Sequence, residues 1–501
     1  MRITNAMMIN NSLANIATNK AQMNILDTQL STLKKIGRPS EDPIIAIRAL
    51  RLRSSLSEVS QYLEKNIPDA NSWLSITQGS LEETNDIVSD LYKYCNQGST
   101  DTFATSERAT IADSLKNLKA AFYSQGNVDC AGRYVFTGFK TDSALTFMTT
   151  DEAANKNYSI TQRFSNDNIS TKTVYKNIVD LSKVDNASVT ADDILSPSSA
   201  SVNRITLGYS DVSATNIGAI TYKSASGTGS FVVNPTTTTD VNYIPGNDEV
   251  ALNTSTGELL LGKNVYNTLK SSSDISFTYD KTSFAKGDVK PEHYFTCVDK
   301  SNDTTADKSD SSAWTSYSKS SEGQNIEYSI NFSQTIKVNT EADEAFSISL
   351  GRDIDELATS IQNVVDIEAK KTKLTNMKSQ QAYSDDVSQA KIQSMLVATG
   401  KEWDLASENM QKTFERGISK MQNYQQQITS ANSDVGNRIS RIALTKSRLQ
   451  EQQTNFKDLK SKNEDVEIEE VSVNNSSAQL VYNASLTAAS KVVKQSLLDF
   501  L

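Results

Sequence analysis

Apolar residues recur every seven positions along the C-terminal part of this chain. The series is Phe414, Met421, Ile428, Val435, Ile442, Leu449 and Phe456. Three or four such heptads are enough to indicate a coiled-coil-like seam, and this series is longer. A neighbouring stripe is only partly apolar, because Thr445 and Gln452 occupy it. One strong stripe beside a weak one predicts a long helix in a multi-helix bundle, rather than a two-stranded zipper.

The N-terminal part carries a shorter seam of the same kind. Its heptad positions are Ile9, Ile16, Met23 and Leu30, which predict a helix over about residues 6–35. Residues 37–43, with the sequence GRPSEDP, then predict a tight reversal. Gly37 is expected to supply a left-handed helix cap, and Pro39 to prevent continuation. Asp42 and Pro43 have the residue types that begin a new helix.

The second predicted helix starts near Pro43 and places Leu52, Leu56 and Leu63 on one apolar stripe. Because proline removes a helix hydrogen bond, we expect a kink or a local break at Pro68. A third helix is predicted over about residues 106–124. The run Arg133–Phe136, between Gly132 and Gly138, has the alternation of a short strand.

The end of the chain predicts a further helix after the acidic stretch of residues 464–470. Its apolar face comprises Tyr482, Leu486, Ala489, Val493, Leu497 and Phe500. An apolar stripe that runs to the last residue is unusual, because free helix ends normally fray. One interpretation is a terminal helix that docks within its own chain. We favour a helix that packs both against the N-terminal seam and against another subunit.

The middle of the chain is polar and predicts β-structure. Strands are expected near residues 204–207, 219–222, 231–233, 275–279 and 327–332, with a hairpin over residues 250–261. The chain thus divides into a helical segment 1–147, a β-rich segment 148–343 and a helical segment 344–501. The predicted fold class is α+β: an elongated, coiled-coil-like bundle of both ends, with the middle inserted as an outer domain.

Composition argues against most enzymatic chemistry. The formal net charge is −10, only 37% of residues are hydrophobic, and there is one histidine, His293. Acidity disfavours a nucleic-acid surface, and a single histidine excludes a multi-histidine metal site. The three cysteines, Cys95, Cys130 and Cys297, form no CxxC pair, and their roles stay open. We therefore expect no enzyme activity, no cofactor, no metal and no nucleic-acid partner.

Two features resemble chemical sites without meeting their requirements. Asp303, Asp307 and Asp310 lack the spacing and glycine of a calcium loop, so a solvated loop is expected. His293 has no nucleophile motif beside it, so a surface or hydrogen-bonded histidine is expected. The start of the chain has no apolar region typical of a cleaved signal peptide, and no segment predicts membrane insertion.

Several short motifs, in this order along the chain, resemble the hook-associated protein 3 family of the flagellin superfamily. They are the start MRIT, the turn GRPSEDP (with Gly37, Pro39, Asp42 and Pro43), a run with Tyr62, Asn66, Ile67 and Ala70, and GRYVFTG (with Gly132, Arg133, Tyr134 and Phe136). The C-terminal DVGNR at residues 434–438 and the ending SLLDFL complete the likeness. Together they cover about residues 1–147 and 350–501, whereas the middle segment departs from short family members.

The resemblance implies a structural protein at the junction between the hook and the filament of a bacterial flagellum, on which flagellin polymerises. It implies a homo-oligomeric ring, contacts with the first hook-associated protein and with flagellin, and an extracellular location. It also implies a flagellar export chaperone and secretion through the type III export apparatus without a cleaved signal peptide. Flagellin or a flagellin-like filament subunit is the alternative within the superfamily, and an enzyme or adhesin with a helical stalk is the alternative outside it.

Overall fold

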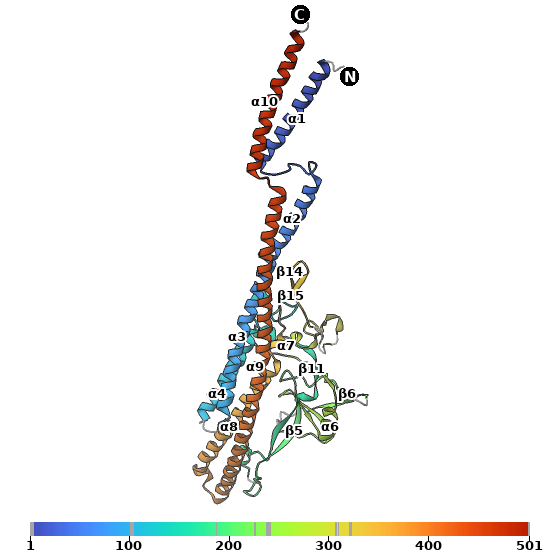
Figure 1. Cartoon of the computed structure of the whole chain (residues 1–501). Helices are drawn as coiled ribbons and strands as arrows, with labels where there is room; N and C mark the ends of the chain where they lie inside the picture. Colours follow the sequence, from blue (N-terminus) through green and yellow to red (C-terminus); the bar gives the residue numbers. More distant parts are fainter. Residues whose placement is uncertain are drawn as a thin grey trace. The chain divides into compact units, whose positions relative to one another are not determined.

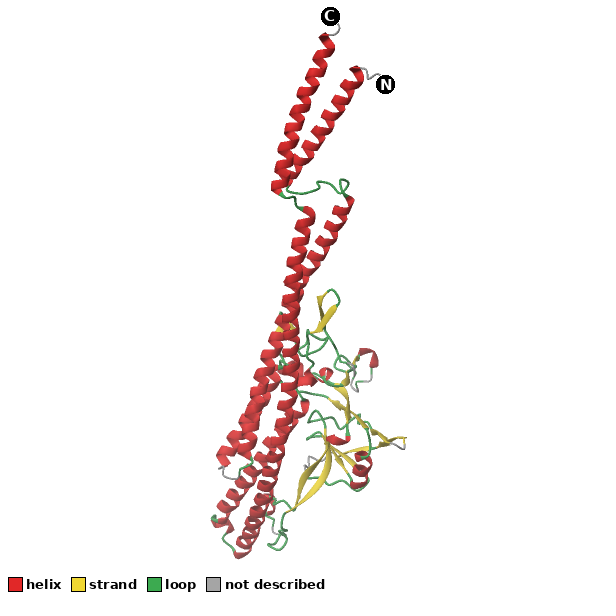
Figure 2. Cartoon of the chain, in the orientation of Figure 1, coloured by secondary structure: helices red, strands yellow, loops and turns green. Residues whose placement is uncertain are grey.

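The chain is helical at both ends and β-rich between them (Figures 1 and 2), as predicted. These observations come from a computed structural model. It describes residues 5–100, 105–186, 188–224, 227–236, 242–305, 308, 310–319 and 323–498.

The α-helices are α1 Asn5–Thr32, α2 Pro43–Gln61, α3 Ile67–Gly98, α4 Thr105–Gln125, α5 Thr150–Ala154, α6 Lys263–Lys270, α7 Ala342–Ala345, α8 Ile348–Lys378, α9 Asp386–Glu464 and α10 Ile468–Leu498. The strands are β1 Asp129–Cys130, β2 Arg133–Tyr134, β3 Tyr158–Phe164, β4 Ile169–Lys176, β5 Ser198–Thr206, β6 Ile220–Ser224, β7 Gly227–Phe231, β8 Val233–Thr236, β9 Val250–Asn253, β10 Glu258–Leu261, β11 Asp274–Lys281, β12 Thr296–Asp299, β13 Thr315–Tyr317, β14 Glu327–Asn331 and β15 Gln334–Lys337.

Two compact units are built from these elements. The first combines Met1–Ala70, Tyr328–Ile336 and Ser440–Leu501, and the second combines Asn71–Glu327 with Lys337–Ile439. Both ends of the chain therefore meet in the first unit, which also contains most of the β14–β15 hairpin, and the two larger sheets lie in the second. The segment boundaries at 147/148 and 343/344 concern the order along the chain, and they stay a prediction.

Helix α9 carries the predicted heptad seam, and its burial is nearly complete. Phe414, Met421, Ile428, Val435, Ile442 and Leu449 are all at most 2% exposed. Small residues let neighbouring helices approach this seam in the second unit. A Cβ at Gly98 of α3 would lie 2.3 Å from the Phe414 ring, and one at Gly417 would lie 3.2 Å from Leu357 of α8. Helices α3, α8 and α9 thus form the predicted multi-helix bundle.

The second helix passes Pro68 without breaking. One π-helical turn, η1 Tyr62–Asn66, joins α2 to α3, and the Ile67 amide donates to the Tyr62 carbonyl. Because a proline ring collides with the carbonyl four residues earlier, the wider π turn makes room for it. The expected disturbance is therefore a change of helical winding immediately before Pro68.

The β-rich region forms two larger sheets. One has the order β4-β5-β10-β9-β8, and the other β13-β12-β3-β11-β6-β7. The predicted hairpin is present as β9 and β10, where Asn253 pairs with Glu258 across residues 254–257. The prediction of one strand over residues 231–233 is wrong, because β7 ends at Phe231 and β8 begins at Val233. Val232 is 78% exposed between β7 and β8, which belong to different sheets.

Strand β3 was not predicted, although its side chains alternate between buried and half-exposed positions. Gln162 occupies one of the inward positions and conceals the apolar alternation. Its side-chain oxygen accepts hydrogen bonds from the Gly208 amide at 3.0 Å and from the Tyr279 hydroxyl at 3.2 Å. A buried amide is tolerated here because both neighbours satisfy it.

Truncation of a side chain on α9 should destabilise the protein where that side chain is in the buried seam, and should be tolerated where the side chain is exposed. We expect Leu449→Ala to destabilise the protein by about 2–5 kcal/mol, because it removes apolar atoms from a filled site. Leu444→Ala, on the same helix, should change stability by about 0.5 kcal/mol or less, since Leu444 is 72% exposed. Urea unfolding followed by far-ultraviolet circular dichroism measures both. Equal destabilisation by the two variants would contradict this view of the seam.

Candidate assembly interface

The two terminal helices, α1 and α10, lie side by side in the first unit (Figure 1). On α1, the predicted seam residues Ile9, Ile16, Met23 and Leu30 are half-buried, and Leu26 is buried. The inward face of α10 is formed by Val471, Asn475, Ala478, Tyr482, Ser485 and Ala489, which are half-buried or buried. The Asn19 side-chain amide donates to the Ser485 hydroxyl at 2.9 Å. This pair therefore has a polar contact at its centre and an incompletely buried seam.

The predicted face of α10 is correct in part. Tyr482 and Ala489 lie on the inward face, but Leu486 is 43% exposed and Ser485 takes the inward position beside it. Because adjacent residues on a helix point about 100° apart, Leu486 cannot share that position. Val493 and Leu497 lie within α10, whereas Phe500 is outside the described residues.

Large apolar side chains remain exposed on the helices of the first unit. On α1 they are Met7, Met8, Leu13 and Ile25, on α2 Ile44, Ile47 and Leu50, and on α10 Ile468, Val473, Leu480, Val481 and Leu486. The predicted positions Leu52, Leu56 and Leu63 of α2 and η1 are half-buried. Exposed apolar residues grouped on adjoining helices are typical of surfaces that bind another protein.

A polar joint connects the end of α1, the middle of α2 and the break between α9 and α10 within this unit. Arg53 of α2 binds Glu464, the last residue of α9, through Nε at 2.8 Å and Nη2 at 2.7 Å. Lys34 binds Asp465 and lies 3.6 Å from Glu464. The main chain adds bonds from the Lys35 amide to the Glu464 carbonyl and from the Val466 amide to the Leu33 carbonyl. The break between α1 and α2 is thereby tied to the break between α9 and α10.

The charges of the joint stabilise one another. The hydrogen bond from Arg53 lowers the pKa of Glu464, and that from Lys34 lowers the pKa of Asp465. The bond to Asp465 raises the pKa of Lys34. Arg53 and Lys34 are themselves substantially exposed, so water screens the electrostatic attraction. Much of the stabilisation therefore comes from the two parallel hydrogen bonds between Arg53 and Glu464.

The turn motif between α1 and α2 is confirmed at its end and wrong at its beginning. Asp42 caps α2 by accepting the Ile44 and Ile45 amides at 2.9 and 3.1 Å, and Pro43 is in the first turn. Gly37 does not supply the left-handed cap. Leu33 adopts that conformation instead, with φ of 57°. Leu33 can hold it because its carbonyl is bonded to Val466, so the joint stabilises a conformation that leucine disfavours.

The second motif, residues 132–138, lies in the second unit. Ala131 and Gly132 both have positive φ, 54° and 80°, and form the two-residue turn of the β1–β2 hairpin. The Arg133 guanidinium lies 5.0 Å from the centre of the Trp73 ring, and Phe136 packs edge to face on Phe346 at 4.8 Å. The predicted strand is shorter than expected, because only Arg133 and Tyr134 pair. The motif joins α3 to the start of the C-terminal helical segment.

Of the two alternatives expected for His293, the hydrogen-bonded histidine is confirmed and the surface position is wrong. His293 is 6% exposed, and its Nε2 lies 3.3 Å from the Ala144 carbonyl. Burial lowers its pKa from 6.5 to about 4, so the ring is neutral at physiological pH.

The described residues of the acidic loop, Asp310 among them, are mostly exposed, as expected, but Asp303 itself is only 1% exposed. It accepts hydrogen bonds from the Thr305 and Asp310 amides at 2.8 Å and from the Trp314 indole at 3.2 Å. Burial raises the pKa of Asp303, but these bonds outweigh it and bring the pKa to about 2. Asp303 therefore organises its loop as an acceptor. Asp307, another residue of this acidic group, is outside the described residues.

No metal or membrane site was found in the part of the chain that the structure describes. Nowhere among the described residues do three or more histidine, cysteine or acidic side chains come together as ligands for one ion. In the same residues, no helix has the length and hydropathy to span a bilayer. Cys95 and Cys297 are buried, and burial raises the pKa of the Cys95 thiol to about 12, so that thiol is unreactive at neutral pH.

Comparison with known proteins gives these surfaces a context. Residues 3–141 match the bacterial flagellin N-terminal helical region. The chain is 29% identical over 146 residues to flagellar hook-associated protein 3 of Salmonella typhimurium, a match over 29% of this chain and 45% of that protein. It is 27% identical over 118 residues to a flagellin of Clostridium tyrobutyricum, covering 24% of this chain and 31% of that one. The solved flagellar hook-associated protein 3 of Legionella pneumophila has 10% identity and a TM-score of 0.31, covering 82% of this chain and 96% of that one.

The polar joint should control how firmly α1 and α10 are held. We expect Glu464→Gln to speed amide hydrogen exchange in both helices about tenfold, because it removes the charge shared by Arg53 and Lys34. Acid should act in the same direction. A carboxylate with a lowered pKa stabilises above its unfolded value of about 4.5, and that gain is lost as pH falls through the folded pKa.

Glu408→Gln is the matched control for this measurement, since Glu408 pairs with Lys412 on α9 and both are exposed. The control should leave exchange in α1 and α10 unchanged. Unchanged exchange in Glu464→Gln would show that the joint does not hold these helices.

His293 should make the second unit sensitive to mild acid. The unfolded chain binds a proton with a pKa near 6.5 and the folded chain near 4, so stability falls as pH drops between those values. We expect a loss of about 2 kcal/mol between pH 7 and pH 5, calculated from that difference. His293→Gln keeps a donor for Ala144 and does not titrate. Its unfolding free energy should lose markedly less over that range, and an identical loss would refute the assignment.

Proposed function

On the premise that this chain is a relative of hook-associated protein 3 in the flagellin superfamily, we propose that it is a structural, non-enzymatic protein of the bacterial flagellum. It forms the junction between hook and filament and serves as the template on which flagellin polymerises. The observation that carries this proposal is the α1–α10 pair, whose seam is half-buried and whose outer faces expose large apolar residues.

The incomplete burial explains why assembly is favourable. Fully burying one leucine or isoleucine contributes about 1.5–3 kcal/mol. The exposed residues of α1, α2 and α10 together offer a gain that is large beside the usual net stability of a domain, about 5–15 kcal/mol. A neighbouring copy that covers these faces supplies that gain. Head-to-tail contacts between such copies close into a ring or continue as a helix, depending on the rotation between subunits.

The same surfaces suit the remaining proposed partners. We propose that the ring contacts the first hook-associated protein on one side and the first flagellins on the other, outside the cell. Before export through the type III apparatus, an export chaperone covers the apolar C-terminal helices. Such a chaperone is needed because Leu480 and Val473, 72% and 66% exposed, would otherwise promote aggregation.

Flagellin itself is the second candidate. It is favoured by the flagellin match over 118 residues. The longer match, over 146 residues, is to hook-associated protein 3, and it favours the junction role. Both candidates use the same terminal helices, so only the place of the subunit in the flagellum separates them.

A strain that lacks this chain distinguishes the two roles by electron microscopy. We expect hooks without filaments and flagellin shed into the medium. Expression of Leu486→Glu should fail to restore filaments, because it puts a charge on an exposed apolar face of α10, and removal of residues 482–501 should fail as well. Asn483→Glu is the matched control, since it alters an exposed polar position of the same helix, and it should restore filaments.

Secretion and folding of each variant are checked first, by its presence in the medium and by circular dichroism. Full restoration by Leu486→Glu would contradict the proposed interface. Filaments of normal length in the deletion strain would contradict the junction role. Hooks without filaments and without flagellin in the medium would favour the flagellin role, because the missing filament protein would then be this chain.

A further inference from the structure

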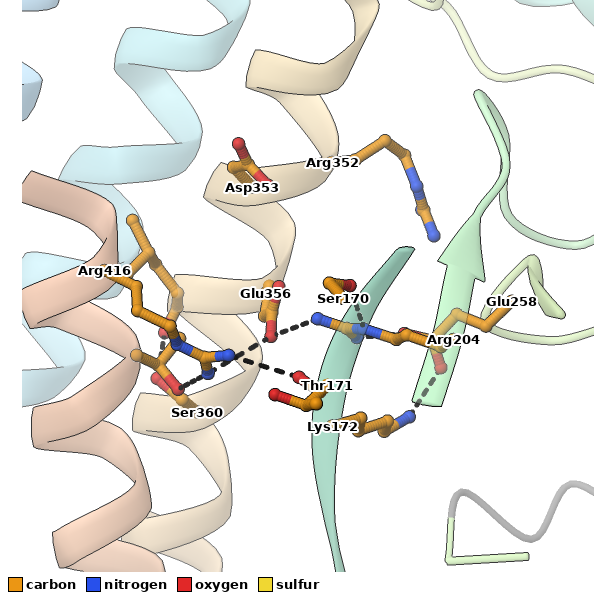
Figure 3. Close-up of polar contacts among 12 residues, drawn as sticks. Ser170, Thr171, Lys172, Arg204, Glu258, Arg352, Asp353, Glu356, Ser360 and Arg416 are labelled. Carbon is orange, nitrogen blue, oxygen red and sulfur yellow. Dashed lines mark hydrogen bonds and ion pairs between the residues drawn. The ribbon is translucent and has the colours of Figure 1, made fainter. Parts of the chain in front are cut away.

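A cavity of about 780 Å³ lies in the second unit, between helices α8 and α9 and the sheet that contains β4, β5 and β10. Its volume is within the range of small-molecule binding sites. Figure 3 shows Arg204 reaching from β5 toward Glu356 of α8, with Arg352 and Arg416 entering the same space from α8 and α9. The assembly surfaces of the first unit do not include it.

Most charges around the cavity are already paired. Arg204 is bound by Glu258 and, at 2.5 Å, by Glu356, and Lys172 binds Glu258 at 2.6 Å. Lys370 binds Glu402 at 2.7 Å. The two charges of each such pair neutralise one another, so these residues are not available to bind an added ion.

The charged residues of the lining, taken together with the residues that form ion pairs with them, have an excess of positive charge. Six cationic and six carboxylate residues line the cavity. Two of the carboxylates, Asp353 and Asp355, are also neutralised by Lys420 and Lys119, which lie outside the lining. The combined set therefore has two more positive than negative charges.

Among the buried and half-buried cations of the lining, Arg352 is the one whose positive charge none of the described carboxylates neutralises. Its Nη2 donates to the Thr256 carbonyl, and its buried Nε has no hydrogen-bond acceptor among the described residues. None of the carboxylates that the structure describes lies within 4 Å of this guanidinium. The other unpaired cation of the lining, Lys116, is exposed. A half-buried guanidinium without a carboxylate is costly unless an anion completes it.

The cavity walls carry hydroxyl groups close to Arg352 and amide groups farther along the two helices. Thr206, Ser255 and Thr256 are on the sheet side, and Asn363 and Asn409 are on the helices. Each of these groups can donate to or accept from an alcohol. We propose that the cavity binds a small polyhydroxylated anion, such as a sugar acid or a sugar phosphate, whose oxyanion pairs with Arg352.

Isothermal titration calorimetry on the full chain tests this with three probes: glucuronate, glucose 6-phosphate and glucose. We expect binding of at least one charged probe and at least about tenfold weaker binding of glucose, because a charge-assisted hydrogen bond to guanidinium is worth that much. Preference for glucuronate identifies a carboxylate ligand, and preference for glucose 6-phosphate a phosphate ligand. No binding of either, or equal binding of glucose, overturns the proposal.

Arg352→Gln should weaken binding of the charged probe about tenfold or more, and Arg352→Lys should weaken it less, since lysine keeps the charge but loses the paired donors. Lys116→Gln makes the same change of charge at the exposed lining position and should have little effect. If Arg352→Gln does not fold, the lysine variant and the three-probe comparison still decide. Equal weakening by Arg352→Gln and Lys116→Gln would reduce the effect to long-range charge and overturn the assignment.

Discussion

The burial of one face of α9 is the interaction on which the helical architecture depends. Six heptad residues from Phe414 to Leu449 are almost inaccessible to water, along a helix of 79 residues. Burial of this kind requires neighbours that follow the same stripe, and small residues at Gly98 and Gly417 permit their close approach. Most of the stability of a helix within a protein comes from the packing of its apolar face, so packing on this stripe makes α9 a fixed element.

The terminal pair α1 and α10 uses the same repeat with a different outcome. Its seam is half-buried, contains the Asn19–Ser485 hydrogen bond, and depends on a polar joint at its base. A polar group in a helical seam fixes alignment at a cost in stability. The pair is thus aligned in the single chain but not fully stabilised by it, which is the behaviour expected of helices that complete their packing in an assembly.

Polar chemistry is concentrated in the β-rich region and where that region meets helices α8 and α9. Its buried polar groups are mostly satisfied internally, as Asp303 and Gln162 illustrate through several hydrogen bonds each. Arg352 differs because its guanidinium faces a cavity without a carboxylate partner. The cavity is lined from α8 and α9 as well as from the sheet, but the buried heptad stripe of α9 does not contribute to the lining.

The sequence by itself determined the long helices and the apolar face of α9. The heptads of α9, the cap at Asp42 and the hairpin of β9 and β10 depend on residue spacing and local bonds, which are visible in the order of the residues. Tertiary structure alone decided what depends on distant partners. Leu33 took the left-handed cap expected at Gly37 because Val466 binds its carbonyl, and Ser485 displaced Leu486 because it meets Asn19 across the pair. The unpaired charge of Arg352 likewise follows from which carboxylates the fold places near it, and residue order does not encode that proximity.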